Sequence, residues 1–302
     1  TGTVAAVTVG FARHVGIFLP WIAEDRWIVP PVHLSPDYAL SLSTAQALAI
    51  AVVAAITWMH TRGLAYGRLV QDVFTTAKIG LLLVLIGLGL LLARHGAGVV
   101  QNFGHPWQQQ GLVPISPGLD ASTWGGLLSA LAIAQVGSLF SSDAWNNITF
   151  AAAEVRNPRR DIPLALALGT GLVLTLYVLA NLVYFAVLPL PSVQGAASDR
   201  VGAAAMEAML PGVGAKLLAA GILVSTFGCA NGMLLAGARA FWAMARDGLF
   251  FPGAGVLNDR GVPERGLVLQ AAWTSMLVLV RTFDPATGKH GNLYGSLLDY
   301  LI

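Results

Sequence analysis

Charged residues are scarce in this chain of 302 residues: Asp, Glu, Lys and Arg together make up 11%, against about 25% in soluble globular proteins. A soluble protein could not cover its surface with so few charges. Because hydrophobic residues reach 56%, most of the apolar surface must face lipid. The net charge of +2 is too small to indicate a nucleic-acid partner. The composition therefore excludes a soluble enzyme and indicates a polytopic membrane protein.

Cysteine and the common catalytic motifs are nearly absent. The single cysteine, Cys229, excludes an internal disulfide framework and a cysteine-based zinc site. His33, His95 and His105 fall singly in expected loops, without the paired spacing of a metal site. The sequence has no Walker A, HExxH or GxSxG motif. We therefore expect no catalytic residue, no metal and no cofactor.

Long apolar segments recur along the chain, and a helix needs about 20 such residues to cross a bilayer. We expect one transmembrane domain over 1–302, with helices at 4–21, 43–60, 72–94, 124–155, 162–188, 215–246 and 265–281, and the start of another at 294–302. The residue alternation of an outer-membrane barrel does not occur. Because both ends look cut, we expect an internal fragment of a longer protein.

Basic residues in the loops indicate how the chain crosses the membrane, because cytoplasmic loops are enriched in Lys and Arg. The loops after the second, fourth and sixth expected helices hold nine arginines: Arg62, Arg68, Arg156, Arg159, Arg160, Arg239, Arg246, Arg260 and Arg265. The opposite side holds six basic residues: Arg26, Arg94, Arg200, Lys216, Arg281 and Lys289. This bias places the start of the first helix in the cytoplasm. We expect an integral protein of a bacterial inner (plasma) membrane.

A polar run at 141–147 (SSDAWNN) interrupts the fourth expected helix. An Asp at mid-membrane costs roughly 2.5–3.5 kcal/mol on insertion scales, so a continuous lipid-facing helix is disfavoured. The run could be a surface loop after a helix that ends at Phe140. That end would leave the span short. A helix broken at about 140–147 explains the run better, because irregular backbone is tolerated in a membrane only against protein or a water-filled cavity.

The residues around this break carry a family resemblance: Phe140 to Trp145, then Asn146, Glu154, Asn157-Pro158 and Ile162-Pro163-Leu164-Ala165. They resemble the sixth helix and following loop of the L-type amino-acid transporters, within the amino acid–polyamine–organocation superfamily. Segments 70–78 (VQDVFTTAK) and 225–232 (STFGCANG) are similar to the family's fifth and eighth helices. The resemblance implies an all-α membrane protein with the LeuT-type fold of two inverted repeats. This chain would cover helices three to nine and the start of the tenth, truncated at both ends.

The resemblance also implies roles for the polar segment. Phe140 would act as a gate, the backbone of Ser141, Ser142, Asp143 and Ala144 would bind the substrate, and Trp145 and Asn146 would complete the substrate-binding segment. Many family members have a small residue in place of Asp143. Its carboxylate could accept a cationic substrate side chain, or it could cap freed N–H groups. Both alternatives stay open at this stage.

Lys78 lies within the third expected helix, close enough to its end to snorkel to the membrane border. In related transporters, a lysine at the matching position occupies the region where sodium sits in sodium-coupled relatives. Ser225 and Thr226 would be its partners from the eighth helix. A fixed ammonium can replace a bound cation electrostatically, and this role predicts sodium-independent transport.

The sequence thus predicts a secondary transporter whose substrate is an amino acid and whose surroundings are the lipid bilayer. We expect alternating access with sodium-independent exchange or facilitated uptake. A polyamine or amine permease of the same superfamily is one alternative, favoured if Asp143 faces the cavity. A membrane sensor that binds an amino acid without moving it is another. No protein partner is indicated by the sequence.

Overall fold

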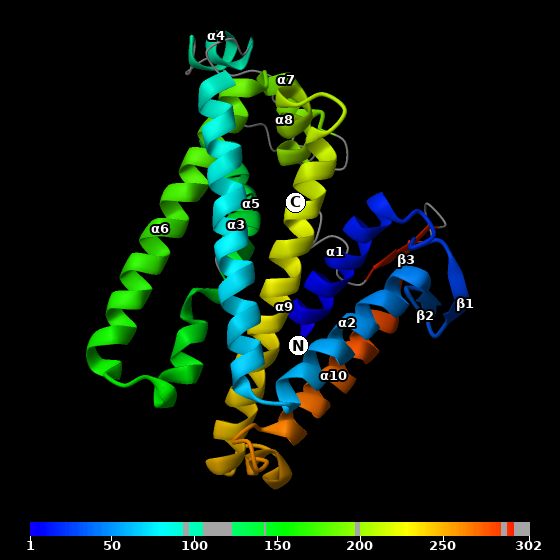
Figure 1. Ribbon diagram of the computed structural model, residues 1–302. Helices are drawn as coiled ribbons and strands as arrows, with labels where there is room; N and C mark the ends of the chain where they lie inside the picture. Colours follow the sequence, from blue (N-terminus) through cyan, green and yellow to red (C-terminus); the bar gives the residue numbers. More distant parts are fainter. Residues whose placement is uncertain (93–96, 105–122, 142, 197–199, 285–288, 293–302) are drawn as a thin grey trace. The chain divides into compact units, whose positions relative to one another are not determined.

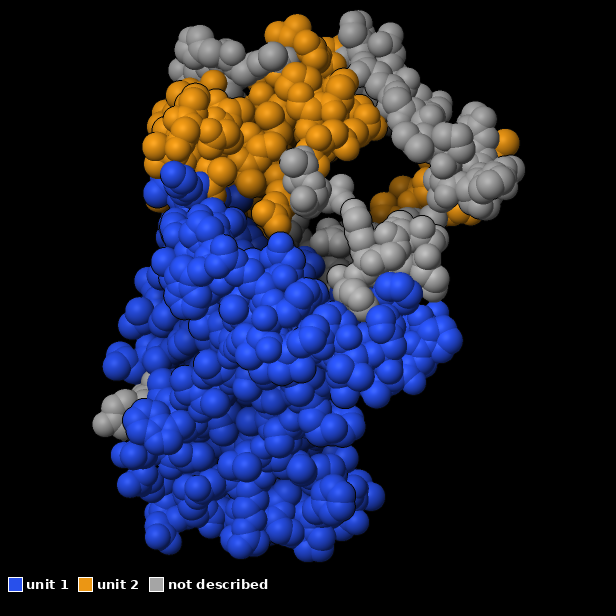
Figure 2. Space-filling view, turned by 90° about the vertical axis from the view of Figure 1, so that its right-hand side faces the viewer, with its two compact units in different colours: residues 1–81, 147–163, 216–298 blue, residues 82–146, 164–215, 299–302 orange. Residues whose placement is uncertain are grey.

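The computed structural model describes residues 1–92, 97–104, 123–141, 143–196, 200–284 and 289–292 (Figure 1). The chain divides into two compact units, which Figure 2 colours separately and which are described one at a time below. Unit 1 comprises Thr1–Leu81, Asn147–Pro163 and Lys216–Leu298, and unit 2 comprises Leu82–Asn146, Leu164–Ala215 and Asp299–Ile302.

Three helices of unit 1 pack on one another: α1 (Gly2–Phe18), α2 (Thr44–Thr61) and α10 (Glu264–Leu279) (Figure 1). α2 begins with a capping box, in which the side chains of Ser43 and Gln46 each accept a hydrogen bond from the other's backbone N–H. Such reciprocal bonds satisfy two donors that a helix start leaves unpaired. The buried core consists of Val4, Val7, Val52, Val53, Ile56, Ala230 and Leu234. This core joins α1 and α2 to helix α9 (Gly214–Arg246).

Glycines on α9 set its close approach to helix α3 (Leu64–Leu92). A Cβ atom at Gly228 would lie 2.8 Å from Cβ of Phe74, and one at Gly232 would lie 3.2 Å from Oε1 of Gln71. A Cβ at Gly221 would lie 3.3 Å from Cδ1 of Leu81. Small residues let helix backbones approach closely where lipid supplies no hydrophobic driving force. From Gly221 to Gly232 the residue numbers rise along α9, while those of the α3 partners fall from Leu81 to Gln71. The two helices are therefore antiparallel.

A four-stranded antiparallel sheet completes unit 1, in the order β1-β2-β3-β4. Its strands are β1 (Trp27–His33), β2 (Tyr38–Ser43), β3 (Val280–Asp284) and β4 (Lys289–Asn292). Tyr38 pairs with Thr282 and Leu40 with Val280, so the hairpin after α1 is bonded to the chain that follows α10. The sequence predicts helices alone and misses these strands, because a search for long apolar segments passes over strands of four to seven residues.

Unit 2 contains α4 (Ala97–Phe103), α5 (Trp124–Ser141), α7 (Leu190–Gln194), α8 (Val201–Met209) and most of α6 (Pro158–Val187). Asn102 of α4 joins the end of α6 to the start of α7. Its Nδ2 donates to the carbonyl oxygens of Phe185 and Leu188 at 2.7 and 2.8 Å. Its Oδ1 accepts from the backbone N–H of Leu190 at 3.0 Å. One half-buried amide thus satisfies three backbone groups where α6 ends.

Four of the described helices are long and apolar enough to cross a membrane: α2, α3 from Leu69, α6 and α9. α1 is apolar but shorter. The observed helices begin and end within a few residues of the expected ranges for α1, α2, α9 and α10, whereas α3 begins at Leu64 and α6 at Pro158. The expected helix at 294–302 lies outside the described residues.

Candidate functional site

The polar segment at 140–147 coincides with a change of helix type; residues up to Asn146 belong to unit 2, and residues from Asn147 onward belong to unit 1. α5 ends at Ser141, and a 3₁₀ helix, η2, runs from Asp143 to Glu154. A 3₁₀ helix of 12 residues is unusual, because such runs rarely exceed three or four residues and often mark functional hinges. Ser142 and the side chains of Phe140, Ser141, Asp143 and Ala144 lie outside the described part. Trp145 is 61% exposed and Asn146 is also exposed.

In unit 1, the packing of α3 against α9 determines the level at which Lys78 lies. Phe74 lies against Gly228 and Leu81 lies against Gly221. Because the helices are antiparallel, Lys78, between Phe74 and Leu81, is level with residues 224–225 of α9. Lys78 is half-buried. The structure therefore brings the predicted lysine and Ser225 to the same level.

The two hydroxyl groups predicted beside Lys78 differ in their surroundings. Oγ1 of Thr226 donates to the carbonyl oxygens of Ile222 and Leu223 at 2.7 and 3.2 Å, so its hydroxyl proton is used within its own helix. Ser225 is half-buried. The predicted segment 140–146 belongs to unit 2, while Lys78, Ser225 and Thr226 belong to unit 1.

A buried polar network that the sequence did not reveal lies near the start of α3. Nδ2 of Asn231 donates to Oε1 of Gln71 at 3.1 Å and to the carbonyl oxygen of Gly67 at 3.2 Å. Nε2 of His60 lies 3.3 Å from the backbone carbonyl oxygen of Asn231. Both His60 and Asn231 are fully buried. The available signal was the presence of these two polar residues within apolar helices, and the network ties α2, α3 and α9 together.

Arg13, which the sequence places inside the first expected helix, belongs to an ion-pair cluster beside the sheet. Its Nε bonds to Oε1 of Glu24, and Nη1 of Arg281 lies 3.6 Å from Oε2 of the same carboxylate. Nη2 of Arg281 donates to Oγ of Ser43 at 3.3 Å and to the backbone carbonyl oxygen of Glu24. The guanidinium of Arg281 also lies over the ring of Trp27. These contacts attach β3 to the start of α2.

Burial affects the pKa of Arg281 in this cluster. Arg281 is 1% exposed, and desolvation lowers its pKa below the ordinary value, while the nearby Glu24 carboxylate raises it back. A buried cation is tolerated when it is paired and hydrogen-bonded. Among the described residues, no group of three or more His, Cys, Asp or Glu side chains could hold a metal ion. We therefore interpret the ion pairs of Glu24 with Arg13 and Arg281 as contacts that stabilise the fold.

Comparison with known proteins shows which family the chain matches and which transporters it is similar to. Residues 27–298 match the family described as amino acid permease. The chain is 29% identical over 207 residues to the b(0,+)-type amino acid transporter 1 of Mus musculus, which covers 67% of this chain and 37% of that protein. It is also 29% identical over 225 residues to the large neutral amino acids transporter small subunit 2 of Homo sapiens, which covers 72% of this chain and 37% of that protein.

These matches confirm the resemblance to L-type amino-acid transporters and, with the mainly helical structure, the expected fold class. The chain spans about 37% of the length of the curated relatives it matches. The apolar helices and the match together show an integral membrane protein. The relatives are named as transporters and not as enzymes.

Proposed function

Because this chain belongs to the amino acid permease family, we propose that it is part of a secondary transporter that moves amino acids across the membrane by alternating access. The proposal involves no covalent chemistry and no cofactor. The LeuT-type fold of the family places substrates near the middle of the membrane, where helices are discontinuous. The proposal therefore requires a discontinuous helix in this chain.

The change from α5 to η2 is the observation that carries the proposal. A helix that stops at Ser141 leaves its last carbonyl groups without partners in the helix, and a new helix that starts at Asp143 leaves its first N–H groups free. Free carbonyl groups attract an ammonium and free N–H groups attract a carboxylate. An amino acid carries both charges. We propose that residues 140–146 form part of its binding site, with Phe140 as the gate.

We also propose that transport is independent of sodium, as exchange or facilitated uptake. The support is the position of Lys78, half-buried and level with Ser225 on the neighbouring helix. A fixed ammonium there would supply the positive charge that a sodium ion supplies in sodium-coupled relatives. The hydroxyl of Thr226 donates its proton to its own helix, and its oxygen can still accept a hydrogen bond from an ammonium, so Ser225 and Thr226 are both proposed as partners of Lys78.

A second substrate class is favoured if Asp143 of the polar segment faces the substrate cavity. A carboxylate in the cavity would pair with a cationic group, as in an amine or polyamine permease or a carrier of cationic amino acids. We further propose that the protein resides in a plasma membrane, the inner membrane of a bacterium. Immunodetection in separated membrane fractions of the source cell tests that location.

Transport by the full-length protein in proteoliposomes tests the proposal. Vesicles preloaded with an unlabelled amino acid should accumulate the labelled amino acid by counterflow, equally with sodium and with choline as the external cation. Polyamines serve as competitors to decide between the two substrate classes. Binding of an amino acid without counterflow would contradict transport and support a sensor. Counterflow that strictly requires sodium would contradict only the proposed role of Lys78 and would leave the proposal of transport intact.

A further inference from the structure

We propose that the end of α2 and the loop before α10 form a binding site for the headgroup of an aminophospholipid, with the phosphate on Arg62 and Arg260 and the ammonium on Asp259 and Glu264. The site lies within unit 1 and is separate from the residues proposed to bind the transported substrate. It does not rest on the proposed function. The arguments concern its position, its construction and its charge.

The cavity lies at the end of α2. α2 is one of the helices able to cross a bilayer, and it ends at Thr61. Trp58, in its last turn, is 61% exposed, and tryptophan is enriched at the membrane–water interface. A cavity of about 400 Å³ is lined there by Trp58, Met59, Arg62 and Arg260. That volume lies within the range of small-ligand sites, and an apolar wall beside two cations suits a lipid headgroup.

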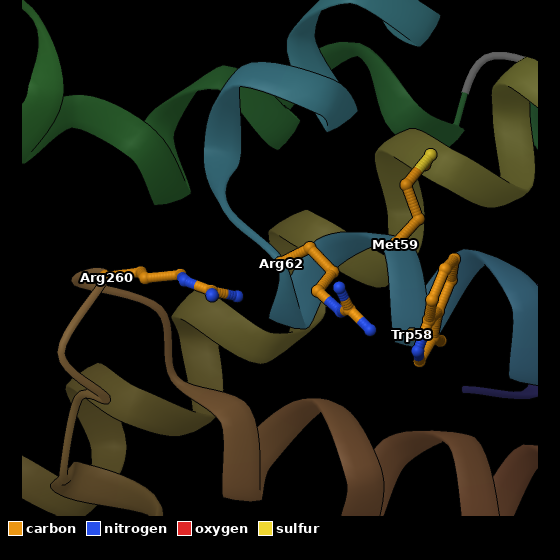
Figure 3. Close-up of a pocket in the computed structure, with 4 residues that line it drawn as sticks. All are labelled: Trp58, Met59, Arg62 and Arg260. Atoms are coloured by element: carbon orange, nitrogen blue, oxygen red, sulfur yellow. The ribbon is translucent and has the colours of Figure 1, made fainter.

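Arg62 and Arg260 reach the cavity from two different segments. Figure 3 shows Arg260 extending from its loop towards Arg62, whose guanidinium turns to the ring of Trp58. The guanidinium carbon of Arg62 lies 4.6 Å from the centre of that ring. Neither arginine forms an ion pair with a carboxylate in the part of the chain that the structure describes. A phosphate in the cavity would meet positive charge from both residues, and guanidinium forks match phosphate oxygens.

The loop that carries Arg260 is held in place by Asn258. Oδ1 of Asn258 accepts from the backbone N–H groups of Arg260 and Val262, both at 3.0 Å. Gly261 adopts a positive φ of 72°, which closes the turn, and its N–H donates to the carbonyl oxygen of Asn258. Nδ2 of Asn258 reaches the carbonyl oxygen of Thr61 at 3.5 Å, so the turn is attached to the end of α2. The backbone position of Arg260 is thus fixed before any ligand binds.

The charges around the site select the headgroup. A second, adjoining cavity of about 360 Å³ shares Trp58, Arg62 and Arg260 with the first and adds the carboxylates of Asp259 and Glu264. Glu264 accepts a hydrogen bond from Nδ2 of Asn258 at 3.2 Å. Two positive and two negative side chains give a site without net charge, which favours a zwitterion over an anionic lipid. A primary ammonium can donate hydrogen bonds to both carboxylates, whereas the trimethylammonium of phosphatidylcholine cannot.

Native mass spectrometry of the full-length protein tests the site. The protein is equilibrated with equal amounts of palmitoyl-oleoyl phosphatidylethanolamine, phosphatidylglycerol and phosphatidylcholine, and the retained lipids are counted. We expect preferential retention of phosphatidylethanolamine, and a loss of about tenfold in R260Q, which follows from removal of a charge-assisted bond. D259N should retain phosphatidylethanolamine and phosphatidylglycerol equally. R246Q is the control, because Arg246, like Arg62, lies over a tryptophan at the end of a helix, here Trp242, and it should behave as the wild type.

Three outcomes would overturn the proposal. The first is equal retention of the three lipids by the wild type, and the second is unchanged retention by R260Q. The third concerns the source of the phosphate: glycerophosphoethanolamine, added as a soluble competitor, shares the headgroup but has no acyl chains. If it bound as tightly as the lipid, the ligand would be a water-soluble phosphate ester and not a membrane lipid. Arg260 lies exposed in a loop, so R260Q is expected to fold normally.

Discussion

The side-chain amide of Asn231 donates to Oε1 of Gln71 at 3.1 Å and thereby ties α9 to the start of α3. Both groups lie in an apolar helical interface, where an unpaired amide is costly. We expect N231A to lower the free energy of unfolding by about 1–3 kcal/mol, because it leaves Oε1 of Gln71 without its donor and removes the side-chain donor to the carbonyl oxygen of Gly67. Thermal unfolding in detergent, followed by intrinsic fluorescence, measures the change.

A matched control exists at Asn181. Its Nδ2 donates to the carbonyl oxygen of Tyr177 within the same helix, and the residue is exposed. N181A should change the free energy of unfolding by no more than about 0.5 kcal/mol, as surface substitutions usually do. A similar loss of unfolding free energy in both variants would show that the hydrogen bonds of Asn231 do not stabilise the fold more than those of an exposed asparagine.

Two glycines should respond to alanine in opposite directions. At Gly228 a Cβ atom would lie 2.8 Å from Cβ of Phe74, so G228A must push α3 and α9 apart, and we expect a loss of about 1–3 kcal/mol. At Gly80 nothing lies within 4 Å of the added Cβ, so G80A should stabilise α3 by about 0.5–1 kcal/mol through helix propensity. Unfolding temperatures of the two variants, measured side by side, provide the test. Equal effects would refute the close packing at Gly228.

The sequence predicts the membrane class and fold class, because composition and apolar length act locally and can be read without knowing the contacts. It also locates the polar segment at 140–147, because buried polar groups are costly in any context. It does not predict the contact of His60 with Asn231, which are 171 positions apart. That contact depends on how α2, α3 and α9 pack. The sheet is missed for the same reason: the pairing of Tyr38 with Thr282 joins segments that carry no strand signal strong enough by themselves.

The ion pair of Glu24 with Arg281 gives a stability prediction with a defined pH dependence. E24Q removes the carboxylate charge that faces both Arg13 and Arg281, and it leaves the buried guanidinium of Arg281 with its bonds to Ser43 and to a backbone carbonyl. Glu24 is 26% exposed, so water partly compensates, and we expect a loss of about 1–2 kcal/mol, below the range for fully buried pairs. D37N, at an exposed acid of the same sheet region, is the control and should change little.

The loss in E24Q should be the same at pH 6 and pH 8. Burial lowers the pKa of Arg281 in the folded state, so the burial penalty would be relieved only as the pH rises through that lowered pKa. An arginine remains charged throughout neutral pH in both the folded and unfolded states. Its contribution is therefore constant there. Chemical unfolding at both pH values checks this, and a loss that varied strongly between them would assign the effect to another group.

The carboxylate of Asp143 is predicted to select cationic substrates. D143N keeps the size of the side chain and its ability to accept a hydrogen bond, but it removes the negative charge. If the carboxylate pairs with a substrate cation, the ratio of cationic to neutral amino-acid uptake should fall by about tenfold, the value of one charge-assisted bond. Competition uptake in proteoliposomes measures the ratio. An unchanged ratio, with uptake preserved, would mean that Asp143 caps freed N–H groups.

Lys78 is predicted to replace a bound sodium ion, and K78M separates that role from packing. Methionine keeps most of the length and apolar volume of the side chain, so the contacts of α3 with α9 around Phe74 and Leu81 should persist. Removal of a fixed positive charge level with Ser225 should lower uptake by about tenfold or more, if one charge-assisted bond is lost. K216M, at an exposed lysine of α9, should leave uptake unchanged. If K78M transported as well as the wild type in choline medium, the lysine would serve only to reach the membrane border.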